Sequence, residues 1–127
     1  MAAGEERGPL VEPAIDLPGL VAQLGGDPED VVMLLGSFLR DAPQTVGRLE
    51  RALAARDARE AEDAAHRLKG SVAWISARRA AALTAGFVGL ARSGDLDSMS
   101  AGLPELVHEL DRVFAEARQV TAGRFGP

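Results

Sequence analysis

The chain has 127 residues, 46% of them hydrophobic and 26% charged, which is enough for one domain with a single hydrophobic core. Its formal net charge of −5 argues against nucleic-acid binding by bulk electrostatic attraction. The absence of cysteine excludes disulfides, thiolate metal ligands and a cysteine nucleophile. The N-terminus is unlike a secretory signal and no apolar stretch is long enough to span a bilayer, so we expect a cytoplasmic protein that does not bind membranes.

From residue 16 onward, the helix-start and helix-stop residues and the spacing of the apolar residues all indicate α-helices. Residues 1–15 are rich in Gly, Pro and Glu without periodicity and are predicted to be a flexible arm. A short helix is expected to begin at Asp16, with Pro18 in its first turn, and to end at residues 25–26. The next helix begins at Asp27 and has apolar residues at helical spacing, and Pro43 is expected to kink or briefly break it.

Three further segments follow the same pattern. Asp57 can cap a helix that ends near Ser76, another helix ends at Gly94, and a last one carries an apolar stripe to Ala117. Residues 121–127 are predicted to be a flexible tail. We therefore predict an all-α fold for residues 16–120, an antiparallel up-down four-helix bundle with a short extra N-terminal helix.

The stretch "AHRLKGS" (65–71) places one of two histidines on the outer face of a predicted helix. If Leu68 is the centre of the buried stripe, His66 lies about 160° away and faces water. Lys69 and Gly70 fall within about 60° of His66. Other residues on or beside this face are Glu62, Asp63, Arg67 and Ala73.

Gly70 raises a question, because glycine costs a helix roughly 1 kcal/mol relative to alanine. One interpretation is that it clears space for a bulky partner to approach His66. The other is that it allows two helices of the bundle to pack closely. The sequence leaves both open.

These residues together resemble the histidine-containing phosphotransfer (HPt) domain family of two-component phosphorelays. The family signature is a His, two variable residues of which the second is usually Leu, and then Lys-Gly-Ser; here it is His66, Leu68, Lys69, Gly70 and Ser71. The resemblance extends to "FLRDAP" (38–43) and "RSGDLD" (92–97) and covers roughly residues 17–119.

The resemblance implies a phosphocarrier rather than an enzyme. His66 would accept a phosphoryl group from the aspartyl-phosphate of a receiver domain, or from a partner kinase, and pass it to another receiver. Lys69 would stabilise charge on the phosphoryl oxygens, Gly70 would admit the partner, and Ser71 would support the local packing. No cofactor is expected in this chain, because the family's Mg²⁺ belongs to the receiver. The partners would be response regulators and a sensor kinase, and the chain would be a monomer. The docking face would include Arg67, Ala73, Glu62 and Asp63.

Three positions depart from the family pattern. Many members have Gln or Glu on the following helix to orient the imidazole, where this chain has Val88. Ser76 stands where a glycine commonly follows the signature helix. Trp74, the single tryptophan, either packs against a neighbouring helix or anchors a docking partner.

Other functions remain possible at this point. Asp63-x-x-His66 and Glu105-x-x-His108 match the spacing of dimetal helical bundles, although both histidines are predicted to face outward. The bundle could also be a binding module that has lost phosphotransfer. The chain has no recognisable ATP-binding segment, so it fits either a free-standing carrier or a domain excised from a sensor kinase.

Overall fold

Aspartate caps begin four of the five α-helices of the chain. In the computed structural model, which describes residues 12–124, the helices are α1 (Leu17–Gln23), α2 (Pro28–Ala54), α3 (Ala58–Trp74), α4 (Arg78–Arg92) and α5 (Leu96–Gln119). The carboxylates that accept a hydrogen bond from an N–H group of the first turn belong to Asp16, Asp27, Asp57 and Asp95. Each cap of this kind stabilises a helix by about 1 kcal/mol.

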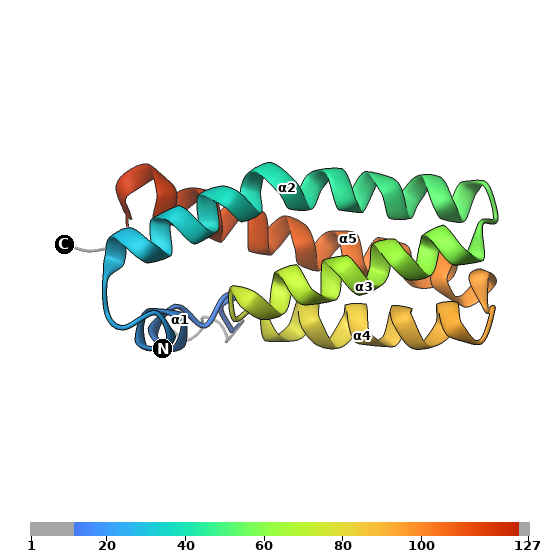
Figure 1. The fold of residues 1–127 in the computed structure, drawn as a ribbon, viewed down its shortest axis with the longest axis horizontal. Coiled ribbons are helices and arrows are strands. Elements are labelled where there is room, and N and C mark those ends of the chain that lie inside the picture. Colours follow the sequence, from blue (N-terminus) through green and yellow to red (C-terminus); the bar gives the residue numbers. More distant parts are fainter. Residues whose placement is uncertain (1–11, 125–127) are drawn as a thin grey trace, which may run out of the picture.

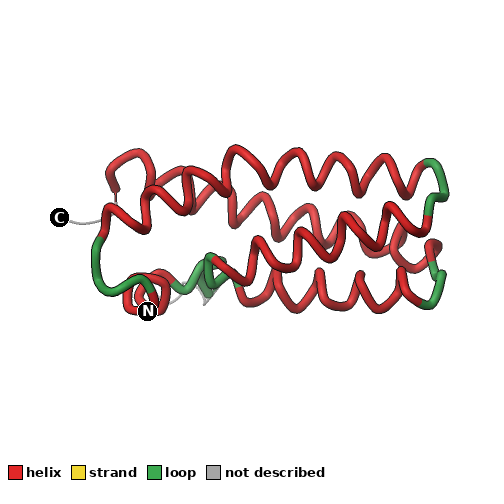
Figure 2. Tube along the Cα trace, viewed as in Figure 1, coloured by secondary structure: helices red, strands yellow, loops and turns green. Residues whose placement is uncertain are grey.

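The four long helices form an antiparallel up-down bundle, as predicted (Figure 1). Each packs against two neighbours, in the ring α2–α3–α4–α5. The connections are three residues long (55–57, 75–77 and 93–95), and the described residues contain no strand (Figure 2). All-α architecture with a short extra N-terminal helix is therefore confirmed.

Unequal helix lengths explain where α1 lies. α2 and α5 have 27 and 24 residues, whereas α3 and α4 have 17 and 15. The two longer helices extend past one end of the shorter pair, and α1 occupies the space beneath them (Figure 1). Its Leu20 is completely buried, so this helix closes that end of the core.

The break that the sequence predicted as one outcome at Pro43 does not occur. α2 runs without a break from Pro28 to Ala54, and α5 likewise continues through Pro104. Both prolines lie on exposed faces. The apolar stripe of each helix is buried on either side of its proline, so tertiary packing outweighs the lost backbone hydrogen bond.

The packed part of the chain begins earlier than residue 16. Ala14 and Ile15, which the sequence assigned to a flexible arm, are each only 3% exposed. Their N–H groups donate to the two carboxylate oxygens of Glu116 at 2.8 and 3.0 Å. A contact with a residue about 100 positions away therefore holds these two residues of the predicted arm on α5.

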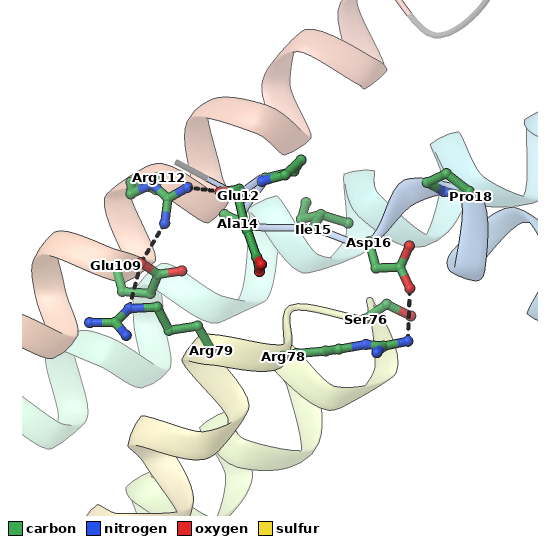
Figure 3. A pocket seen from close by; sticks show the side chains of 11 residues that line it. Glu12, Ala14, Ile15, Asp16, Pro18, Ser76, Arg78, Arg79, Glu109 and Arg112 are labelled. Carbon is green, nitrogen blue, oxygen red and sulfur yellow. Dashed lines mark hydrogen bonds and ion pairs between the residues drawn. The ribbon is translucent and has the colours of Figure 1, made fainter. Parts of the chain in front are cut away.

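Arginines complete the attachment of the N-terminal segment (Figure 3). Arg112 donates to the backbone oxygen of Glu12 and, at 2.8 Å, to the buried carboxylate of Glu109. Arg78 pairs with Asp16 at 2.8 Å. Several polar contacts thus attach residues 12–16 to α4 and α5.

The predicted tail also starts later than expected. A wide helical turn, η1 (Val120–Arg124), continues from α5, and Val120 is buried. The rest of the predicted arm and tail, residues 1–11 and 125–127, lies outside the described residues. Among residues 12–124, no helix is both long and apolar enough to cross a membrane.

Candidate functional site

The buried stripe of α3 sets the direction in which His66 points. The residues of α3 that are buried are Ala61, Ala64, Ala65, Leu68 and Val72. His66 lies on the opposite side of the helix and is exposed, as the spacing from Leu68 predicted. The imidazole is therefore available to a partner without any rearrangement of the core.

One side of His66 opens into a groove between α2 and α3 with a volume of about 380 Å³. From the α3 side it is lined by His66, Arg67, Gly70, Ser71, Trp74 and, at the end of the helix, Ile75. From the α2 side it is lined by Leu34, Ser37, Phe38, Asp41 and Ala42. The sequence did not identify the α2 wall as part of the site, although "FLRDAP" contributes three of its residues.

The other side of His66 faces α4. Glu62 of α3 pairs with Arg92 of α4, with 3.0 Å between Oε2 and Nε. Lys69 follows Glu62 by seven residues, which is about 20° short of two full helical turns. The two side chains therefore lie on the same side of the helix. Lys69 is partly buried, and no described residue forms an ion pair with it. A cation thus stands beside the imidazole without a carboxylate to neutralise it.

The remaining predicted site residues separate into two groups. Asp63, Arg67 and Ala73 are exposed and form part of the outer surface of α3. Ser71 is half-buried, and its hydroxyl donates to the carbonyl of Arg67 at 3.1 Å. Glu62 forms an ion pair with Arg92, and this pair links α3 to α4.

An ion pair links α2 to α3 outside the groove. Arg48 Nε of α2 lies 2.8 Å from Glu60 Oε2 of α3. The hydrogen bond from Arg48 lowers the pKa of the Glu60 carboxyl, and the same bond raises the pKa of Arg48. Both groups therefore remain charged through the neutral range, and the pair links α2 to α3.

Gly70 has no packing role in the bundle. It is exposed, and a Cβ atom placed there would meet nothing within 4 Å. The same is true of Gly86 and Gly89 on α4. The structure therefore agrees with the interpretation that Gly70 leaves open space beside His66.

α4 does not supply the group that would orient the imidazole. Val88 is 3% exposed and belongs to the hydrophobic core. Within residues 12–124, no side chain forms a hydrogen bond with the His66 ring. The ring is therefore attached to the fold only through its own backbone, and a partner can select its orientation.

The two histidines do not form an interior metal site. His66 and His108 are both exposed, whereas ligands of a dimetal bundle must point into the core. The described residues contain no group of three or more side chains placed to hold a metal ion.

Trp74 is mostly uncovered by its own chain. Its exposed fraction is 62%, so the neighbouring helix covers only the smaller part of the side chain. The turn that follows it places Ser76 at φ = +61°, the left-handed conformation that glycine adopts without strain. Glycine at this position would therefore relieve backbone strain.

Comparisons with known proteins identify the family. The Hpt domain model matches residues 33–116, which include the whole α3 site. The chain belongs to the Hpt domain family. It is thus a histidine phosphotransfer protein of the phosphorelay type, from a family whose members interact with kinases and receiver domains.

A solved structure with the same fold is that of histidine-containing phosphotransfer protein B (HptB) from Pseudomonas aeruginosa PAO1. The two are 25% identical with a TM-score of 0.70, and the match covers 90% of this chain and 96% of that one. No curated protein matches the sequence.

The open position of Gly70 gives a first testable prediction. Gly70→Ala should raise the free energy of unfolding by about 0.5–1 kcal/mol, because alanine reduces the freedom of the unfolded chain and its methyl group meets no neighbour. Gly94→Ala is the matched control and should lower stability, because Gly94 has φ = +74°. Thermal or urea unfolding measures both. A destabilised Gly70→Ala protein would mean that the position is packed.

Proposed function

We propose that His66 is the phosphoryl acceptor of this Hpt protein. It takes the group from the aspartyl-phosphate of a receiver domain, or from a partner kinase, and passes it to a second receiver. The observation that carries the proposal is an exposed imidazole with Lys69 on one side and the open Gly70 position on the other. The Hpt domain match, which spans these residues, supports it.

The chemistry requires a neutral imidazole. One ring nitrogen carries the proton and the other attacks phosphorus with its lone pair. The bond from phosphorus to the aspartate oxygen breaks, the carboxylate leaves with the electron pair, and a phosphoramidate forms on His66. The reverse reaction, with an aspartate of the second receiver as nucleophile, discharges the carrier.

Lys69 contributes electrostatically. Phosphoryl transfer passes through a state in which negative charge is spread over the three oxygens that do not react, so catalysis depends on positioning and charge. The ammonium group of Lys69 offsets that charge without forming a covalent bond. When Mg²⁺ is bound in the acidic pocket of the receiver, it supplies further stabilisation of the same oxygens.

A second candidate is a bundle that docks receivers without accepting phosphate. The burial of Val88 favours it, because the usual hydrogen-bond partner of the imidazole is absent. The two functions differ in one observable, since only the first leaves acid-labile phosphate on the protein.

His66→Gln tests the proposal directly. We expect it to abolish acceptance of phosphate from a phosphorylated receiver and to change stability by under about 0.5 kcal/mol, because the side chain is exposed. His108→Gln, also exposed, is the control and should transfer at the wild-type rate. Radiolabelled phosphate on the protein after mixing with the receiver is the measurement. Label on His66→Gln protein would contradict the proposal.

The role of Lys69 is a matter of rate. Lys69→Ala should still become phosphorylated but more slowly, by roughly 10- to 100-fold, because one charge–charge interaction of a few kcal/mol is lost. Lys69→Arg keeps the charge and should recover part of the rate. Stopped-flow or quench-flow transfer measures both, and an unchanged rate in Lys69→Ala would remove this residue from the site.

A further inference from the structure

Trp74 is one of two large hydrophobic side chains that the described part of the chain leaves exposed. Its exposed fraction is 62%, and that of the other, Met33, is 72%. Trp74 lines the α2–α3 groove together with His66, whereas Met33 does not. An indole at the edge of the reactive groove therefore has no covering from within the domain.

The spacing along α3 places Trp74 within reach of any partner of His66. The two residues are eight positions apart, which is about 12 Å along the helix axis. A standard protein interface covers about 800 Å² on each partner, or a disc of about 16 Å radius. Trp74 is also rotated by about 80° around the helix from His66, so a receiver domain that contacts both must extend from His66 toward the α2–α3 groove.

The surface between the two residues does not hold a partner away. Gly70 and Ala73 occupy it, and both are exposed. Gly70 lies directly between His66 and Trp74, whereas Arg67 and Ser71 line the groove to one side of that path, so one partner surface can contact His66 and Trp74 at once. On the α2 side the groove is lined by Leu34, which is partly exposed, and by Phe38, of which only 5% is exposed.

We propose that Trp74 is the anchor by which this protein selects its receiver domains. The inference rests on the proposed role of His66. The selected receiver presents two features: the anionic pocket of its phosphorylated aspartate, opposite His66 and Lys69, and an apolar site that receives the indole, displaced by about 12 Å along the axis of α3. Tryptophan in a desolvated contact is the residue type that most often dominates binding energy. A receiver with a carboxylate at the site that receives the indole must bury that charge against the ring and is rejected.

Two phosphoryl donors separate docking from chemistry. One is a phosphorylated receiver, and the other is phosphoramidate, which is too small to touch Trp74 while it reacts at His66. With the receiver, Trp74→Ala should lower kcat/KM by about 10- to 100-fold, mainly through KM. With phosphoramidate it should react like the wild type. Met33→Ala, which removes the other exposed apolar side chain from outside the groove, should match the wild type with both donors.

Each other result overturns a defined part of the inference. Wild-type transfer kinetics in Trp74→Ala, or an equal loss in Met33→Ala, would show that the indole does not anchor the receiver. A loss with phosphoramidate as well would mean that Trp74 supports the His66 site rather than docking. If phosphoramidate and receiver both fail to label the wild-type protein, the proposed function itself is wrong.

The single tryptophan also gives a direct binding signal. Titration with an unphosphorylated, tryptophan-free receiver should shift Trp74 emission to shorter wavelength as the ring leaves water. The same shift should occur in His66→Gln, because docking does not require the reactive nitrogen. If a receiver binds without a change in the emission wavelength of Trp74, the proposal that Trp74 anchors the receiver is contradicted.

Discussion

Five buried side chains on one face of α3 decide where every other group of that helix points. Three of them are alanines (Ala61, Ala64 and Ala65), whose small size lets both neighbouring helices approach. Leu68 and Val72 fill the core at the same depth. Because successive residues turn by about 100°, burial of this stripe forces His66, Gly70 and Ala73 outward. The reactive surface is thus a geometric consequence of the core.

The two flanks of that surface differ in character. Toward α4 lies Lys69, next to the pair formed by Glu62 and Arg92, so this flank is electrostatic. Toward α2 lies a groove of mixed lining whose apolar part includes Trp74. Charge on one flank can act on the phosphoryl oxygens, while apolar area on the other can supply affinity for a partner. A partner surface that matches both must be oriented in one way across α3, which places its reactive carboxylate at His66.

Local signals in the sequence were sufficient for much of this account. Helical periodicity places His66 outside and the core stripe inside, aspartates mark the helix starts, and "HRLKGS" identifies the family. Contacts between distant segments were not accessible in the same way. Glu116 binds the backbone of Ala14 and Ile15 through hydrogen bonds that no local sequence pattern predicts. α2 continues through Pro43 because its apolar residues are packed on both sides of the proline. The α2 wall of the groove depends on the register between two helices, which periodicity within each helix cannot fix.

If one nitrogen-bound phosphate resides on His66, mapping of the modified residue must find it there. The wild-type protein is mixed with a phosphorylated receiver, kept at alkaline pH to preserve phosphohistidine, digested and sequenced by tandem mass spectrometry. We expect a single phosphate on the peptide that contains His66 and an unmodified His108. Phosphate on His108, or on a hydroxyl or carboxyl side chain with His66 unmodified, would contradict it.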